Sequence, residues 1–278
     1  MINKVRNRIV ELKSEFAYRV ALSKHTQNLP ALDDTDGAIL DRLKHEGIYV
    51  TSLAALRLET TPQLLSESYN HLAAMPASKA TGRKLPQIYT VTDLPAFSQW
   101  GSQQRLLNII ENYIGLPIAF HGVHLRKDFP NENQFGTLLW HKDSEDRRII
   151  KAIVYLSDVE PKHGPFEYVP KYLTNLYSLN YYRIYYKLWQ SGYLGINDDT
   201  LKNIVPKSAW KSCPGKAGTV ILVDTKSVLH HGTLRSEERS ALFFVYTANP
   251  PKKPEDCTQY WDDTFPKPAR AASIAEVV

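Results

Sequence analysis

Seven short segments rich in β-branched and aromatic residues fill the chain between residues 117 and 250, and they restrict the fold more than any other feature. Each segment is bounded by Gly, Pro, Asn or Asp, which is typical of strands joined by turns. The segments are IAFHGVHLR, GTLLW, KAIVYLSDV, PFEYVP, GTVILVD, VLHHGT and SALFFVYTA. Strands at this density indicate a sandwich or a barrel rather than alternating βαβ units.

Helical periodicity precedes the strands. Apolar residues spaced three and four apart predict a helix over residues 1–25. Residues 35–58 predict a short helix that stops at Gly47, followed by a strand in IYVTSL, and two more helical stretches cover residues 62–75 and 94–114. We therefore expect a single domain over 1–278, which comprises a mainly helical N-terminal part (1–116), a β core (117–250) with an insertion (173–205), and a C-terminal extension (251–278).

Two segments have roles that the sequence leaves open. The first helix has one apolar face, with Ile2, Val5, Ile9, Leu12, Phe16 and Val20, and one basic face, with Lys4, Arg6, Arg8 and Lys13. It can pack against the domain or a second subunit, or rest as a peripheral helix on an anionic membrane. The insertion 173–205 is helical and rich in tyrosine, and its tyrosines either pack onto the barrel or form a lid that contacts substrate.

Composition excludes several classes of protein. The charged fraction of 23% argues against disorder and fibres, and no apolar run is long enough to cross a bilayer. The net charge of +5 is too diffuse for nucleic-acid binding and favours an anionic or amphiphilic small molecule. The two cysteines, Cys213 and Cys257, are far apart, and no secretory signal is evident, so we expect free thiols in the cytoplasm. The oligomeric state is left open.

The triplet His141-Lys142-Asp143 carries the most specific chemistry. On an extended segment, residues two apart face the same way, so His141 and Asp143 can both face a barrel interior. Two imidazoles and one carboxylate hold non-haem Fe(II) on one face of an octahedron and leave the other face open. The third ligand would come from the pair His230-His231 on a distant strand, and His230 is the preferred choice.

Arg239 opens the last of the seven strands. By the period of two it shares a face with Ala241 and Phe243, so a guanidinium is directed where apolar side chains go. A buried arginine needs a carboxylate partner, and the distal carboxylate of 2-oxoglutarate would meet this need. The alternative is a surface arginine in the polar turn RSEER, where Arg235 is an equally basic neighbour.

These motifs, in the order WHKD, KAIVYLSDVEPKHGPFEYVP and GTVILVDTKSVLHHGTLRSEERSALFFVY, resemble the phytanoyl-CoA dioxygenase-like branch of the Fe(II)/2-oxoglutarate-dependent oxygenases over residues 117–250. The resemblance implies a double-stranded β-helix, or jelly-roll, with helices on its outside. It also implies that Fe(II) is the cofactor and that 2-oxoglutarate and O₂ are cosubstrates. The residues that match the family's site are His141, Asp143 and His230 as metal ligands and Arg239 as the cosubstrate anchor.

Further residues are expected near the site. Lys151 and Tyr155 share one face of the strand after the triplet and are candidates for substrate and cosubstrate contact, and Trp140 is a candidate pocket wall. Asp143 argues against the related halogenases, which have a small residue there. Where many family members have Pro-Gly-Ser-His, residues 170–173 read Pro-Lys-Tyr-Leu, so the family does not supply the substrate.

The resemblance thus predicts hydroxylation of an unactivated C–H bond in a small molecule, with release of succinate and CO₂. Desaturation, cyclisation or epoxidation at the same centre are alternatives. So is a jelly-roll binding protein without catalysis.

Overall fold

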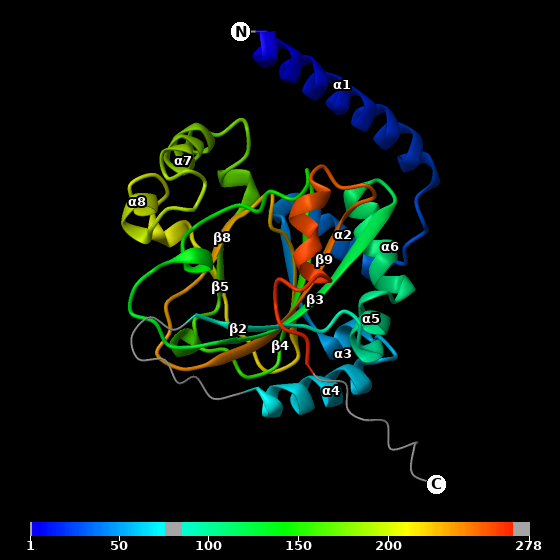
Figure 1. Cartoon of the computed structure of the whole chain (residues 1–278), viewed down its shortest axis with the longest axis vertical. Helices are drawn as coiled ribbons and strands as arrows, with labels where there is room; N and C mark the ends of the chain where they lie inside the picture. The colour runs from blue at the N-terminus through cyan, green and yellow to red at the C-terminus, as the bar shows by residue number, and fades with distance from the viewer. Residues whose placement is uncertain (1, 76–84, 269–278) are drawn as a thin grey trace.

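The computed structural model describes residues 2–75 and 85–268, with side chains from Val10 onward. Its strands form two antiparallel sheets that face each other (Figure 1). The larger sheet has the order β1-β7-β4-β9-β3-β2 and the smaller one the order β6-β5-β8. The strands are β1 (Ile48–Ser52), β2 (Gln87–Thr90), β3 (Ile118–Asp128), β4 (Ile150–Tyr155), β5 (Phe166–Val169), β6 (Lys211–Cys213), β7 (Thr219–Asp224), β8 (Leu229–Gly232) and β9 (Arg239–Ala248).

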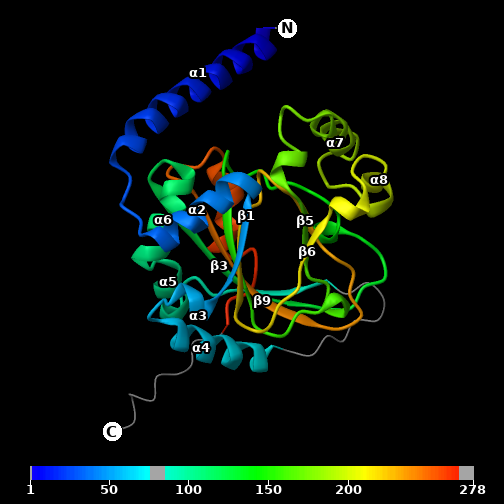
Figure 2. The same cartoon turned by 180° about the vertical axis from the view of Figure 1, so that it is seen from behind.

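The larger sheet is buried on both faces. On β4, Ala152 and Val154 pack outward into a core shared with the helices, whereas Ile153 and Tyr155 face the smaller sheet across the barrel interior. This alternation follows from the two-residue period of a strand. The helices on the outer face are α2 (Asp34–Glu46), α3 (Leu53–Leu56), α4 (Thr61–Ala74), α5 (Pro95–Gly101) and α6 (Gln104–Ile114). Figure 2 shows them along one side of the barrel.

Helix α2 begins and ends where its sequence indicates. The Asp33 carboxylate accepts a hydrogen bond from the Asp36 backbone N–H at 2.7 Å, which caps the N-terminus. Gly47 ends the helix with φ of 83°, a conformation that glycine adopts without a Cβ penalty. The predicted stop and the strand after it are therefore confirmed.

Some expected elements differ in the structure. The helical stretch 94–114 is divided at Ser102 and Gln103 into α5 and α6, since Gln103 has extended φ and ψ. The segment GTLLW is not a strand but a 3₁₀ turn, η2 (Gly136–Leu138), followed by an isolated bridge between Trp140 and Ile196. The short strands β2 and β6 were not predicted. A strand of three or four residues is too short for its alternation of apolar and polar residues to be recognised in the sequence.

The insertion forms a small helical unit on the outside of the smaller sheet. It contains α7 (Leu179–Gln190) and α8 (Asp198–Lys202), which lie beside β5 and β8 in Figure 1. Ile184, Leu188 and Leu201 pack with Val169 of β5 and Leu229 of β8 in a separate core cluster. The insertion is thus held by its own apolar contacts.

Helix α1 (Ile2–His25) extends away from the barrel (Figure 1). It contacts the body through Glu15, which pairs with Arg147 at 2.8 Å, and through Tyr18, whose ring lies 4.5 Å from the same guanidinium. Tyr18 and Leu22 pack against the core of the domain, whereas Leu12, Phe16 and Val20 are exposed, Phe16 to 71%, so these three do not pack against this domain. The side chains predicted at positions 2–9 lie outside the described residues. Within the described residues, no helix is long and apolar enough to span a membrane.

The C-terminal extension closes one edge of the barrel. Its 3₁₀ helix η6 (Pro254–Tyr260) lies against β3, and the Thr92 hydroxyl donates to the Tyr260 carbonyl at 2.5 Å. The Thr90 backbone N–H donates to the Pro266 carbonyl at 3.0 Å. Residues 269–278 of the predicted extension lie outside the described residues.

Two glycines of α2 provide a matched test of this fold. A Cβ on Gly47 would lie 2.6 Å from Val228 Cγ1, in addition to the strain of its positive φ, whereas a Cβ on Gly37 would meet nothing within 4 Å. We expect Gly47→Ala to destabilise the protein by about 2–4 kcal/mol. Gly37→Ala should stabilise it by about 0.5–1 kcal/mol, because alanine loses less entropy in a helix. Urea unfolding measures both, and equal effects would contradict the assigned backbone conformations.

Candidate metal centre

His141, Asp143 and His230 gather at one end of the barrel. One potential ligand atom from each lies within 4.8 Å of the other two. His141 Nε2 is 3.7 Å from Asp143 Oδ1, and the two imidazole centroids are 4.4 Å apart. A single ion can therefore contact all three residues, as the sequence predicted.

Backbone hydrogen bonds fix the positions of these three residues. His141 and His230 donate N–H groups to each other's carbonyls, at 3.0 and 3.1 Å, which joins the triplet to β8. The Asp143 N–H donates to the Thr225 carbonyl at the end of β7. The Lys142 ammonium points away from the group and donates to the Ser227 carbonyl at 2.8 Å. The alternation expected for an extended triplet is thus present.

The choice between His230 and His231 follows from the strand geometry. Adjacent residues on β8 face opposite sides of the sheet. His230 lies opposite Tyr168 of β5, which faces the interior, whereas His231 lies opposite Glu167. His231 Nε2 is 3.0 Å from a Glu167 carboxylate oxygen, and its Nδ1 is 2.9 Å from the Leu138 carbonyl. Both nitrogens of His231 are therefore engaged outside the barrel.

The three residues have the protonation states that a metal ion requires. Burial lowers the pKa of His141, and it lowers the pKa of His230 to about 3, so both imidazoles are neutral near pH 7. Nδ1 of His141 donates to the Leu139 carbonyl at 2.7 Å and Nδ1 of His230 to the Val228 carbonyl at 3.3 Å, which leaves each Nε2 lone pair for a metal. Burial opposes ionisation of Asp143, but Lys151 and the two histidines hold its pKa below the usual range. This donor set fits a divalent ion such as Fe(II).

Lys151 is the main surprise of this centre. Its ammonium lies 2.7 Å from Asp143 Oδ2, and both side chains are largely buried. Although burial disfavours the charged amine, Asp143 raises the pKa of Lys151 above its ordinary value. The candidate ligand Asp143 therefore has one oxygen directed toward a permanent cation. Lys151 is close to the centre, as predicted, but its contact is with a ligand.

Arg239 is buried, as its place in the strand pattern predicted. It pairs with Asp128, its cross-strand neighbour on β3, through Nε at 3.2 Å and Nη2 at 2.7 Å. Arg235 Nη1 also reaches Asp128 Oδ2 at 3.0 Å, and Arg126 Nε reaches Oδ1 at 2.7 Å. Three guanidinium groups thus surround one carboxylate, which we call the arginine cluster. Arg235 is as buried as Arg239, so the alternative of a surface arginine in that turn does not hold.

The arginine cluster holds a surplus of buried positive charge. Burial together with Arg239 outweighs Asp128 and lowers the pKa of Arg235 to about 10, whereas Asp128 raises that of Arg239 despite its burial. Two glycines make room for the guanidinium groups. A Cβ on Gly164 would lie 2.8 Å from Arg235 Nε, and one on Gly232 would lie 3.0 Å from Arg235 Nη2. Buried cations in excess of carboxylates favour binding of an anion.

Tyr155 and Trp140 have different surroundings from those expected. The Tyr155 hydroxyl donates to the Cys213 carbonyl and accepts from the Phe166 N–H, each at 3.0 Å, so it braces β5 and β6 against β4. Trp140 is fully buried, stacks on His231 at 3.8 Å between ring centroids, and donates its indole N–H to Asp198. It faces the insertion and not the metal ligands. The expectation of a substrate contact by Trp140 is corrected to a packing position.

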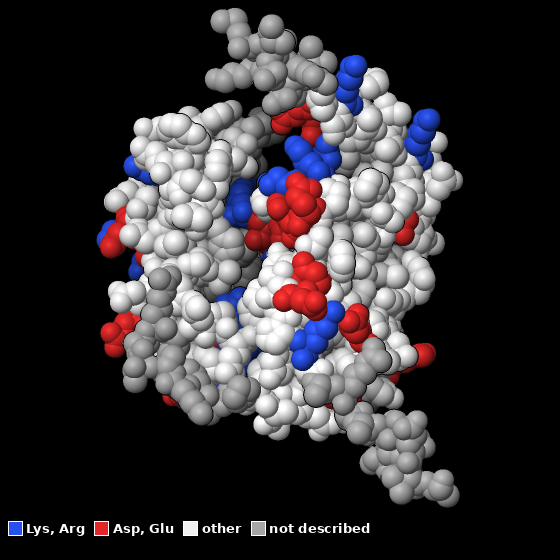
Figure 3. All heavy atoms as spheres, in the orientation of Figure 1, with Lys and Arg blue, Asp and Glu red and all other residues white. Residues whose placement is uncertain are grey.

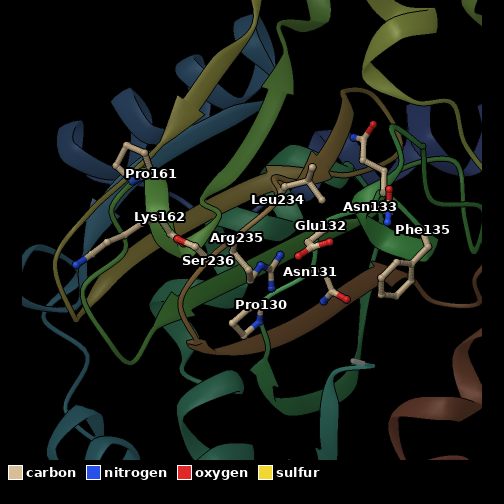
Figure 4. Close-up of a pocket in the computed structure, with 11 residues that line it drawn as sticks. Pro130, Asn131, Glu132, Asn133, Phe135, Pro161, Lys162, Leu234, Arg235 and Ser236 are labelled. Carbon is tan, nitrogen blue, oxygen red and sulfur yellow. The ribbon is translucent and has the colours of Figure 1, made fainter. Parts of the chain in front are cut away.

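Two cavities adjoin these groups. One of about 480 Å³ is lined by Asp143, alone among the three candidate ligands, and by residues of η6, including Asp256 and Gln259. The other, of about 1070 Å³, is shown in Figure 4 and includes Arg235 but none of the three candidate ligands. One cavity therefore adjoins Asp143 and the other adjoins the arginine cluster at Arg235.

The sequence alone did not identify Asp128, Arg126 or Glu167 as parts of the site. Asp128 and Arg126 lie at the end of a predicted strand, and only the register of β3 against β9 brings Asp128 opposite Arg239. A charged Arg-Lys-Asp run at a strand end was the available signal.

Comparisons with known proteins establish the fold. No family sequence model and no curated protein sequence matches the chain. Among solved structures it is similar to HygX from Streptomyces hygroscopicus with nickel and 2-oxoglutarate bound, at 18% identity and a TM-score of 0.51 over 78% of this chain and 88% of HygX. EctD from S. alaskensis with bound Fe matches at 17% identity and a TM-score of 0.56, over 81% of this chain and 83% of EctD.

A third similar structure is SnoN, a non-heme alpha ketoglutarate dependent epimerase from nogalamycin biosynthesis. It matches at 15% identity and a TM-score of 0.51, over 77% of this chain and 83% of SnoN. These similarities confirm the predicted fold, a jelly-roll with flanking helices.

The neighbouring histidines of β8 allow a direct test of the ligand choice. We expect His230→Ala to lower the affinity for Ni(II) by about 100-fold or more, because a ligand is lost. His231→Ala should leave that affinity nearly unchanged and cost about 1–3 kcal/mol of stability, because Glu167 loses its partner. Calorimetric titration and urea unfolding measure the two effects. If His231→Ala lowered the affinity for Ni(II) and His230→Ala did not, His231 would be the ligand.

Lys151→Met tests the cation beside Asp143. Without metal, the variant should be less stable by about 2–4 kcal/mol, because a largely buried carboxylate loses its counter-ion. With metal, the stabilisation by Ni(II) should exceed that of the wild type, because the ammonium no longer competes for Asp143. Thermal unfolding with and without Ni(II) measures both. A smaller metal-induced stabilisation in the variant would show that Lys151 assists binding instead.

Proposed function

We propose that this protein is an Fe(II)/2-oxoglutarate-dependent dioxygenase, of the phytanoyl-CoA dioxygenase-like branch, that hydroxylates an unactivated C–H bond of a small molecule. The observation that carries the proposal is the combination, inside one jelly-roll, of three convergent ligand atoms with a buried excess of arginine. A structural metal site would need the first feature but not the second. The fold shared with 2-oxoglutarate-bound HygX supports the same conclusion.

Each residue has a defined part in this proposal. His141, Asp143 and His230 hold the metal, and the carbonyls of Leu139 and Val228 orient the two imidazoles. Bound Fe(II) supplies the oxygen chemistry that couples decarboxylation of 2-oxoglutarate, to succinate and CO₂, with oxidation of the substrate.

Arg239 anchors the distal carboxylate of 2-oxoglutarate, with Arg235 adding positive charge. Asp128 holds both guanidinium groups in place, so the anchor is oriented before the cosubstrate arrives. Tyr155 keeps β5 close to the anchor through its two backbone hydrogen bonds. Lys151, whose ammonium lies beside Asp143, is proposed to contact the substrate.

The substrate class follows from charge and lining. Lys151 and Lys226, both partly buried, place positive charge near Asp143, which supports an anionic or amphiphilic small molecule as the proposed substrate. Desaturation, cyclisation or epoxidation at the same centre are alternative outcomes of the proposal. We also propose that the protein works in a reducing compartment such as the cytoplasm, because Cys213 and Cys257 are buried free thiols.

A second candidate is a jelly-roll binding protein without catalysis. The observation in its favour is the 2.7 Å ion pair between Lys151 and Asp143, because a cation of the protein itself already neutralises the candidate ligand. In that case the three residues would bind no divalent ion at micromolar concentration. The His230→Ala titration against wild type therefore separates the two candidates.

The decisive experiment adds Fe(II) and 2-oxoglutarate to the protein without oxygen. Chelation of the iron by the keto acid should produce a weak visible charge-transfer band that neither component gives alone. Arg239→Met should raise the 2-oxoglutarate concentration needed for this band by about 10- to 100-fold, because a charge-assisted hydrogen bond is lost. Arg105→Met, which breaks a similar arginine–aspartate pair with Asp36 on the outer helices, is the matched control and should leave it unchanged. Absence of the band in the wild type would refute the cosubstrate assignment.

A further inference from the structure

The insertion presents an unusual number of large side chains to solvent. Six of them form what we call the aromatic ridge: Tyr177, Leu179, Tyr182, Tyr186, Trp189 and Tyr193. Tyr177 is 95% exposed and Trp189 63% exposed. An exposed apolar group of this kind marks a surface that meets a partner or a membrane.

Four of the six ridge residues lie on the outer face of α7, whose inner face is packed against the rest of the chain, and Tyr177 and Tyr193 flank the helix. Ile184 and Leu188 of α7 are buried in the insertion's own core. Tyr185 lies toward the barrel, with the Lys142 ammonium 5.9 Å from its ring, and the tilted ring of Tyr181 contacts it at 4.4 Å between centroids. Packing within the chain therefore accounts for the inner residues and leaves the ridge unexplained.

The acidic residues of the insertion, Asp198 and Asp199, lie on α8, whereas the segment that carries the aromatic ridge is basic. Between Glu167 and Asp198 the sequence contains Lys171, Arg183 and Lys187 but no acidic residue. Arg183 and Lys187 lie on α7 itself and are exposed, among the ridge residues. Tyrosine and tryptophan with interspersed Lys and Arg is the composition that proteins place at the level of lipid headgroups.

A second apolar surface lies at the same end of the molecule. Helix α1 exposes Leu12, Phe16 and Val20, which are four residues apart and so form one stripe. Figures 1 and 2 both show α1 and α7 at this end, apart from each other. Figure 3 shows the molecule hollowed at this end between the two. A flat surface can meet both helices at once, whereas either stripe alone is narrow for a stable protein interface.

We infer that this end of the protein docks on the surface of an anionic lipid bilayer, with the aromatic ridge and the Leu12–Phe16–Val20 stripe in the headgroup region. The tyrosine hydroxyls and the indole N–H keep contact with water while the rings leave it. Arg183 and Lys187 contribute attraction to anionic headgroups. The inference does not depend on the metal or the cosubstrate.

Vesicle flotation with the full-length protein tests the inference. We expect binding to vesicles of phosphatidylcholine mixed with phosphatidylglycerol, and clearly weaker binding to phosphatidylcholine alone. The variant Tyr182→Ser/Tyr186→Ser/Trp189→Ser should weaken binding to the mixed vesicles by about tenfold or more, because three interfacial rings are lost. Arg183→Gln/Lys187→Gln should weaken binding to mixed vesicles and leave the weak binding to phosphatidylcholine unchanged.

The matched control is Tyr69→Ser/Trp261→Ser, which removes two exposed rings, 45% and 53% exposed, that are not on the ridge or on α1. It should bind the mixed vesicles as the wild type does. No binding by the wild type, or equal loss in the control and the ridge variant, would overturn the inference. So would a dimer of the wild type in solution that the ridge variant abolishes, because the ridge would then be an interface between two copies. Circular dichroism confirms that each variant is folded.

Discussion

The pleat of the β-strands, which sends neighbouring side chains to opposite faces, governs this structure. On β8 it turns His230 toward the barrel interior and His231 toward Glu167 on the outside. On β4 it gives Lys151 and Tyr155 one common face, and on β9 it points Arg239 inward with Ala241. A shift of one residue in any of these strands would turn these polar side chains away from the interior. The helices on the larger sheet hold the register, because their apolar contacts require the alternate residues of the same strands.

Charge inside the barrel is the second organising feature. Asp128 and Asp143 each neutralise basic side chains within the fold, the first with three arginines and the second with Lys151. The two carboxylates differ in how much positive charge remains uncompensated beside them. Asp128 cannot balance its three partners, so the arginine cluster keeps a positive excess, whereas Asp143 is matched by one ammonium. An anion would therefore be drawn to the first position, and a metal ion would have to compete at the second.

Much of this could be predicted from the sequence, because period and turn chemistry are local properties. The sandwich or barrel of strands, the stop at Gly47, the His141–Asp143 pair and the inward direction of Arg239 follow from spacing along single strands and helices, and the resemblance to the oxygenase family narrowed the first of these to a jelly-roll. What could not be predicted depends on which strands are neighbours. Asp128 opposite Arg239, Lys151 beside Asp143 and Trp140 under the insertion join segments that only the closed barrel brings together. The segment GTLLW shows the limit for short elements, since its composition is that of a strand and its place in the chain makes it a turn.

The mutual backbone hydrogen bonds of His141 and His230 have a consequence for the order of folding. They join the triplet to a strand that follows the whole insertion, so the three ligands do not exist as a group until both sheets have closed. A chain emerging from the ribosome would pass most of its length without any place for a metal ion, and the ion cannot act as a template for the barrel. Contacts this distant in sequence form slowly. The three ligands therefore come together late in folding, after both sheets have formed.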